Sequence, residues 1–286
     1  MNGAPAPAGE ARPARPPLQA VAMRRRLARL ARGGLRAAAL PLLSVTLLLV
    51  LWEIGCRAFA VPDFLLPAPS AIWRASIEAG PVMLGHTLTT LNTILAGFLV
   101  SILVSLPLAV AITSSPWLAS AIYPLLVLTQ SVPKVALAPI LVVSLGAGET
   151  SRVVITFLVA FFPLVLSMAT GLLAVPPELI ELSRSLRAKR WQELVLVRMP
   201  FAVPFIFSGL KLAMTFAVVG AVVGEFVAAD QGLGYQIASA TAFFRTSLAF
   251  GALLILSALG IVLFQLVVLV ERVFFPWSLP EGGARP

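Results

Sequence analysis

The sequence is poor in the side chains that most enzymes use for catalysis. Its 286 residues include one cysteine, Cys56, and one histidine, His86, so no internal disulfide can form. It has no H-E-x-x-H zinc motif, no C-x-x-C pair and no G-x-S-x-G nucleophile turn. Metal-dependent hydrolysis and triad catalysis lack their parts, so we expect a protein that is not an enzyme. We interpret His86 as an interfacial side chain rather than a proton relay.

A phosphate-binding loop is also missing. The pattern G-x-x-x-x-G-K-[ST], whose backbone amides cradle nucleotide phosphates, does not occur in the chain. The glycines at positions 232 and 234 are interpreted as a turn rather than a nucleotide site. Any ATP chemistry must therefore take place on a partner, and we expect no cofactor on this chain.

Charged residues are scarce, which excludes an ordinary soluble domain. Only 12% of residues are charged, 59% are hydrophobic and the mean hydropathy is +0.98, whereas soluble domains are about 45–50% apolar. Apolar runs near the ~20 residues needed to cross a bilayer recur along the chain. The runs are continuous rather than alternating, so they predict helices and not barrel strands. The fold class is therefore all-α, in a polytopic membrane protein.

About six transmembrane helices are predicted. The third is interrupted by three prolines and three polar residues, so either a bent helix or a short helix followed by a broken one is possible there. The predicted spans are Ala38–Ala60, Thr87–Thr113, Trp117–Gly146, Arg152–Leu173, Val203–Ala228 and Phe250–Phe275. The interrupting residues of the third are Pro124, Gln130, Ser131, Pro133, Lys134 and Pro139.

The distribution of basic residues predicts which loops face the cytosol. The first 36 residues carry eight arginines against one acid and are interpreted as a disordered or interfacial leader that sets topology, in preference to a nucleic-acid-binding tail. With a cytosolic N-terminus, the inner segments hold fourteen basic residues and the outer loops two, as the positive-inside rule requires. The predicted division is a leader at 1–36, a membrane domain at 37–275 with a cytosolic loop at 174–202, and a cytosolic tail at 276–286.

A charged stretch, Glu181–Pro200, separates two of the apolar runs. Seven charged side chains in it would cost roughly 20 kcal/mol in lipid, at about 2.5–3.5 kcal/mol each, so the stretch must lie in water. A helix is predicted to start at Pro176–Glu178, and a second one, Lys189–Arg198, to end at Pro200. Two such amphipathic helices suit either an interfacial stabiliser of the loop or a docking surface for a soluble partner.

The same stretch resembles the EAA loop of ATP-binding-cassette (ABC) importer permeases. Glu181, Ala188 and the run Val197-x-Met199-Pro200 match that motif in spacing, whereas leucine and serine replace its two alanines at positions 182 and 183. Arg187 stands where the family has glycine. Because arginine at φ > 0 is strained by about 1 kcal/mol or more, we expect a local turn that differs from the family's.

Further stretches are similar to permeases of nitrate, sulfonate and taurine importers, and the resemblance extends from Phe64 to Arg272. They occur in the family's order along the chain. The stretches are Leu66–Ser70, Ser131–Pro139, Gly146–Glu149, Phe161–Pro163, Gly224–Glu225 and Gly232–Tyr235.

The resemblance implies a type I ABC importer permease in a bacterial cytoplasmic membrane, with cytosolic termini. Two copies would enclose the solute path, two separate ATPase subunits would bind ATP and Mg, and an external solute-binding protein would deliver a small, sulfonate- or nitrate-like anion. The residues implied to contact the ATPase are Glu181, Ser183, Arg184, Arg187, Ala188 and Pro200.

Four polar residues within spans are candidates for the solute path, because polar groups in lipid must face protein or water. They are Gln130, Ser131, Lys134 and Glu225. Lys134 would either attract an anionic solute or form a structural ion pair, and Lys211 is interpreted as snorkelling to the cytosolic edge. Two rival functions remain open: an ion-coupled secondary transporter, which would typically show inverted repeats, and a membrane scaffold without transport.

Overall fold

The computed structural model describes residue 40 and residues 43–278, and its contacts divide the chain into two compact units, residues 1–60 and 61–286. In the first unit, residues 43–58 form a helix in which Arg57 Nε donates a hydrogen bond to Glu53 Oε1 at 2.7 Å. The predicted leader (1–36), the start of the first predicted span and the tail beyond residue 278 lie outside the described residues.

The second unit consists of helices joined by short connections. In chain order they are α2 (Pro69–Glu78), α3 (Gly80–Ser114), α4 (Pro116–Gln130), the 3-10 turn η1 (Lys134–Leu137), α5 (Ala138–Leu145), α6 (Glu149–Leu173), α7 (Pro177–Ser185), α8 (Arg190–Gln192), the π-helical turn η2 (Glu193–Arg198), α9 (Met199–Ala228), α10 (Leu233–Ala242), α11 (Thr246–Phe274) and the 3-10 turn η3 (Pro276–Ser278). No strand occurs in the described part of the chain, which agrees with the predicted all-α class.

Four of these helices are long and apolar enough to cross a membrane: α3, α6, the continuous helix Arg190–Ala228, and α11. A fifth span is possible if the bent pair Trp117–Gln130 and Lys134–Leu145, which meet at 85°, cross together. The described residues thus hold up to five of the six predicted spans. For the third span, the broken form is the one observed.

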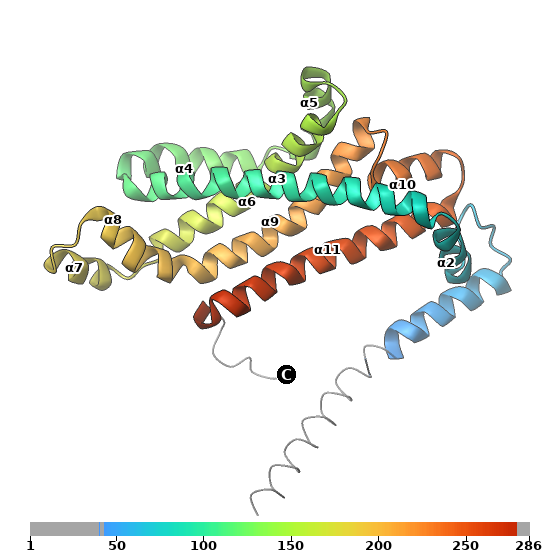
Figure 1. The fold of residues 1–286 in the computed structure, drawn as a ribbon, viewed down its shortest axis with the longest axis horizontal. Coiled ribbons are helices and arrows are strands. Elements are labelled where there is room, and N and C mark those ends of the chain that lie inside the picture. The colour runs from blue at the N-terminus through green and yellow to red at the C-terminus, as the bar shows by residue number, and fades with distance from the viewer. Residues whose placement is uncertain (1–39, 41–42, 279–286) are drawn as a thin grey trace, which may run out of the picture. The chain divides into compact units, whose positions relative to one another are not determined.

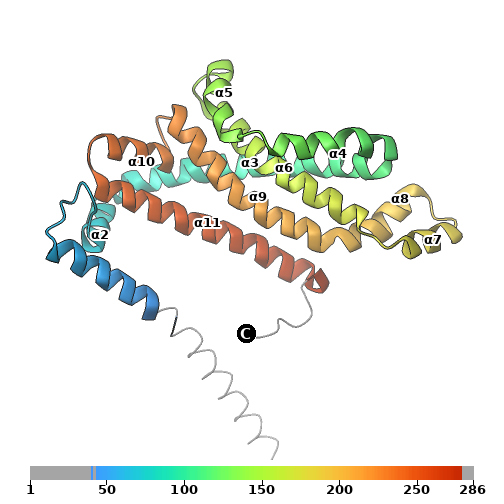
Figure 2. The same cartoon turned by 180° about the vertical axis from the view of Figure 1, so that it is seen from behind.

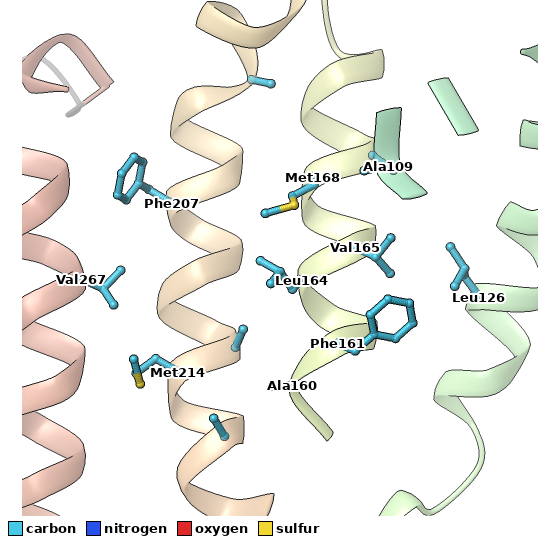
Figure 3. Packing of buried hydrophobic residues seen from close by; sticks show 14 of the residues in the cluster. Ala109, Leu126, Ala160, Phe161, Leu164, Val165, Met168, Phe207, Met214 and Val267 are labelled. Carbon is cyan, nitrogen blue, oxygen red and sulfur yellow. The ribbon is translucent and has the colours of Figure 1, made fainter. Parts of the chain in front are cut away.

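The core lies where α6 packs between α3 and α9, with α11 on the far side of α9 (Figures 1 and 2). Leu164 and Met168 of α6 point toward α9, and Phe207 and Met214 on the other side of α9 point toward α11, which carries Val267 (Figure 3). Phe161 and Val165 lie on the side of α6 that faces α3 and α4 (Figure 3). Lipid offers no hydrophobic drive for association, so close van der Waals packing must hold these helices together.

Small residues allow that packing. A Cβ added to Gly97 of α3 would overlap the side chain of Thr156 in α6, and one added to Gly220 of α9 would come within 2.8 Å of the Thr156 Cα atom. Three helices therefore meet at one threonine, which is fully buried.

One boundary prediction was wrong: the helix predicted over Lys189–Arg198 does not end at Pro200. It continues without a break from Arg190 to Ala228 over 39 residues. The π-helical turn η2 lies just before Pro200. A wider turn gives room for a proline ring that would otherwise clash with the carbonyl four residues earlier.

The packing at Thr156 predicts unequal effects of two glycine substitutions in the same helix. Gly97→Ala should destabilise the protein by about 1–3 kcal/mol, because the new methyl group has no room. Gly85→Ala is the matched control: a Cβ there meets nothing within 4 Å, so it should leave stability unchanged or raise it by up to about 1 kcal/mol through helix propensity. Thermal unfolding in detergent measures both. Equal melting temperatures for the two variants would contradict the proposed contact.

Candidate functional site

The charged loop (residues 174–202) lies at one end of the α6–α9 pair, and α2 and α10 lie at the other end (Figures 1 and 2). Helix α7 begins with Pro177 and carries Glu178 in its first turn, where proline and an acidic side chain both favour a helix start. Glu181, Arg184 and Arg187 are exposed, and Glu181 forms no ion pair with any other described residue. The loop thus presents a charged helix face to its surroundings.

The predicted contact residues do not all share that face. Ser183 is 7% exposed, and its hydroxyl donates to the Ile180 carbonyl within α7 at 2.8 Å. Ala188 is half-buried, and Pro200 is exposed at the start of α9. The structure therefore separates an exposed group, which includes Glu181, from residues that shape the loop.

Helix α7 ends in a Schellman turn centred on Arg187. The amide of Arg187 donates to the Arg184 carbonyl at 2.9 Å, and the amide of Ala188 donates to the Ser183 carbonyl at 3.0 Å. This pair of bonds requires a left-handed residue, usually glycine, just past the helix. Arg187 has φ = 57°, so the left-handed conformation forms here although the residue is an arginine.

A buried carboxylate holds the loop to the spans. Glu193 is 8% exposed, and Arg198 donates to its Oε1 atom from Nη2 at 2.6 Å and from Nε at 2.9 Å. Arg184 approaches the other oxygen at 3.4 Å. Arg198 also donates to the carbonyl of Leu172, at the end of α6, at 3.3 Å.

The sequence reasoning missed Glu193 and Arg198. Glu193 and Arg198 are five positions apart, and in an α-helix this spacing places two side chains on different faces. Here the turn is π-helical, with more residues per turn, so the two side chains meet. The proline that follows such a pair is the only sequence signal of the wider turn.

The break between α4 and η1 brings together Gln130, Ser131 and Lys134, three of the predicted path residues. Helix α4 has 15 residues, which is about 22 Å at 1.5 Å per residue, so the break falls within the ~30 Å depth of a bilayer core. Lys134 Nζ lies 5.0 Å from the centre of the Phe162 ring and 3.5 Å from the Gln130 carbonyl oxygen. It forms no ion pair within the described chain.

Glu225, the fourth predicted path residue, is enclosed. It is 1% exposed, and its carboxylate accepts hydrogen bonds from the Thr90 hydroxyl at 2.8 Å and from the Gly234 amide at 2.7 Å. The Leu233 amide donates to the same hydroxyl at 2.8 Å. Because both amides are at the start of α10, the carboxylate of Glu225 and the hydroxyl of Thr90 satisfy one free N–H group each, and the negative charge suits the positive end of that helix.

Two glycines after α9 leave the space that the Glu225 side chain occupies. Gly232 has φ = 115° and a Cβ there would overlap the Glu225 carboxyl group, while a Cβ on Gly234 would come within 2.8 Å of the Glu225 Cβ. The Gly232 amide donates to His86 Nδ1 at 3.1 Å. His86 is therefore hydrogen-bonded within this packed junction, and its interfacial position stays a prediction.

Lys211 was predicted to snorkel to the cytosolic edge, but it has a charged partner within the protein. Its Nζ atom forms an ion pair with Glu271 Oε2 at 2.7 Å, which joins α9 to α11. Glu271 is 3% exposed, and a buried charge of this kind needs a partner. The partner is sixty residues away in sequence, so no local spacing could reveal it.

Comparison with known proteins assigns the family. Residues 101–276 match the family described as the binding-protein-dependent transport system inner membrane component. The chain is 37% identical to the riboflavin transport system permease protein of Chloroflexus aurantiacus, over 82% of this chain and 88% of that protein. It is 34% identical to the formylaminopyrimidine transport permease protein of Halalkalibacterium halodurans (83% and 95% covered) and 28% identical to the taurine transport system permease protein of Escherichia coli (81% and 86% covered).

The chain therefore belongs to the binding-protein-dependent transport system inner membrane component family and is an ABC importer permease, an integral inner-membrane protein. The fold agrees: an inward-facing structure of the methionine ABC transporter MetNI matches with a TM-score of 0.59 at 19% identity, covering 71% of this chain and 98% of that one. The predicted resemblance and fold class are confirmed.

The strained turn predicts a stabilising substitution. Arg187→Gly should raise the stability of the protein by about 1 kcal/mol relative to Arg187→Ala, because only glycine adopts the left-handed conformation without cost. The alanine variant removes the same side chain and keeps the strain, so it controls for lost contacts. Melting temperatures in detergent should differ by about 2–4 °C. Identical values would show that the turn is unstrained.

Proposed function

We propose that this chain lines the solute path of an ATP-driven importer together with a second copy, and that its charged loop docks on a separate ATPase subunit. The observation that carries the proposal is the exposed charged face of α7, with Glu181 unpaired among the described residues, on a chain that has no phosphate-binding loop. Two ATPase subunits, which hold ATP and Mg, and an external solute-binding protein complete the assembly. The N- and C-termini lie in the cytosol.

The mechanism follows from how the loop is tied to the spans. Arg198 bonds both to Glu193 and to the end of α6, so a push on α7 acts on α6 and α9 together. From Glu193 to Glu225 the helix is continuous, a distance of roughly 48 Å at 1.5 Å per residue. Movement of the loop therefore tilts one continuous helix, whose far end is hydrogen-bonded to α10 through Glu225 and the Gly234 amide. Rigid-body motion of packed helices is the usual form of such switching.

The docking proposal predicts that Glu181→Ala will reduce ATP-driven uptake by about 10- to 100-fold, the effect of losing one charged hydrogen bond, while the protein stays in the membrane. Glu178→Ala is the matched control, since it removes an exposed acidic side chain from the same helix outside the motif. Uptake into proteoliposomes with the co-purified ATPase measures both variants.

Two outcomes would contradict this proposal. Uptake that survives ATP depletion and deletion of residues 181–190 would favour an ion-coupled transporter. Labelling of a Ser185→Cys variant by an impermeant reagent from outside intact cells would place the loop on the wrong side of the membrane.

For the cargo, we infer a small anionic solute of the sulfonate or nitrate kind. Lys134 is a half-buried cation at a break in a membrane-spanning segment, with no ion pair in the described chain. An anion passing the break would neutralise it, which suits the relative whose name gives taurine. The second candidate is a heterocyclic solute, favoured because the relatives named for riboflavin and formylaminopyrimidine are more similar in sequence, at 37% and 34%.

Uptake by the Lys134→Gln and Lys134→Arg variants separates these candidates. With an anionic cargo, glutamine should lower uptake at least about tenfold, the loss of one charge-assisted contact, and arginine should retain most of it. Taurine and formylaminopyrimidine are each added as competitors of uptake, and the importer's own solute-binding protein is present in every assay. Competition by formylaminopyrimidine alone, with full activity of the glutamine variant, would exclude the anionic cargo.

A further inference from the structure

A polar cavity of about 460 Å³ lies between the end of α3 and the charged loop. Its volume falls within the ~300–1,000 Å³ of small-ligand sites. Thr113 and Ser114 line it from the last turn of α3, and Arg184, Arg190, Glu193 and Arg198 line it from the loop. We call it the basic cavity.

The charges of the basic cavity do not balance. Three arginines face one carboxylate, which leaves two positive charges in excess. Arg198 is committed to Glu193 and is 18% exposed, whereas Arg184 approaches the same carboxylate only at 3.4 Å and is 68% exposed. Arg190 is exposed and forms no ion pair with another described residue. Two guanidinium groups therefore remain available for an anion, and guanidinium matches the geometry of phosphate.

The cavity lies at one edge of the membrane-spanning part of the chain. Thr113 and Ser114 end a 35-residue apolar helix, which at 1.5 Å per residue is roughly 52 Å long. That length exceeds the ~30 Å hydrocarbon core, so these two residues lie beyond the core, within reach of the headgroup region that borders it. Of the lining residues, Arg184 is also on the exposed face of α7 that we propose meets the ATPase, whereas Arg190 belongs to α8 and Arg198 to η2. The cavity lies at the border between the loop and the end of α3.

Two exposed tryptophans lie close in sequence to residues that line the basic cavity. Trp117, at the start of α4, is 87% exposed, and Trp191, next to Arg190, is 58% exposed. Tryptophan is enriched at the headgroup level of membranes, where its ring is half apolar and half polar. Neither ring lines the cavity itself, but each closely follows a lining residue in the chain, Ser114 or Arg190. Exposed apolar rings at these positions suit a lipid surface rather than free phosphate or an acidic protein segment.

We propose that the basic cavity binds the phosphate of an anionic phospholipid from the inner leaflet, through Arg184 and Arg190. Basic pockets on the cytoplasmic side of membrane proteins suit such headgroups. The inference rests on the proposed inward position of the charged loop. A lipid bound there would link the charged loop to the end of α3, so lipid composition would bias the movement of the loop.

The test uses the full-length chain with its co-purified ATPase and phosphatidylglycerol as the probe. Native mass spectrometry counts the lipid retained per chain, and a thermal-shift titration gives its apparent affinity. Arg190→Gln should weaken the affinity about fivefold and the Arg184→Gln, Arg190→Gln pair about 25-fold, since each basic side chain near an anionic surface contributes about 1 kcal/mol. Arg272→Gln, which removes an exposed arginine near the end of α11, is the matched control.

Three results would overturn the proposal. The first is equal phosphatidylglycerol affinity in the Arg190→Gln and Arg272→Gln variants. The second is a thermal shift with phosphatidylcholine as large as with phosphatidylglycerol. The third is saturation of the site by inorganic phosphate, which would identify a free anion as the occupant. Failure of the proposed orientation is separate, because it appears in the Ser185→Cys labelling and not in the lipid affinity.

Discussion

The close contact between α6 and α9 is the constraint on which the rest of the structure depends. Helices in lipid gain nothing from excluding water, so they associate only where small side chains let their surfaces meet. At Thr156, glycines of α3 and α9 provide that fit from both sides. With the three spans held in this way, their ends occupy defined positions, and both polar regions of the protein are built on those ends.

Near each end of the continuous helix Arg190–Ala228, a buried glutamate joins the span to the segment beside it. Glu193 is held by Arg198, which also reaches the end of α6, and Glu225 caps the start of α10 through its hydrogen bonds to Thr90 and Gly234. A buried carboxylate is stable only when its charge is compensated by donors or by a cation. Each junction therefore resists separation of its helices, and α9 is suited to carry movement between the charged loop and the opposite end of the molecule.

Much of the architecture was predictable from local sequence. Long apolar runs predicted the spans, and Pro133 and Pro139 with the polar residues beside them predicted that the third would be interrupted, because a proline in a helix interior removes a backbone hydrogen bond. The continuation of the second loop helix into α9 was not predictable in the same way: a proline usually marks a helix start or a kink, and the π-helical turn that absorbs Pro200 leaves little trace in sequence. The partners of Glu225, Lys211 and Glu193 were also missed, because each depends on which helix faces which.

The sequence by itself determined the class of protein, because long apolar runs must form helices in lipid however those helices are arranged. It also determined which segment must lie in water, because lipid excludes charged side chains. Only the tertiary structure decided what the polar residues do. It enclosed Glu225, left Lys134 without a carboxylate partner in the described chain, gave Arg187 a left-handed backbone and gathered three arginines around one cavity. The physical reason is range: hydrophobicity and helix-breaking act within one segment, whereas the pairing of a charge depends on side chains that folding brings from distant parts of the chain.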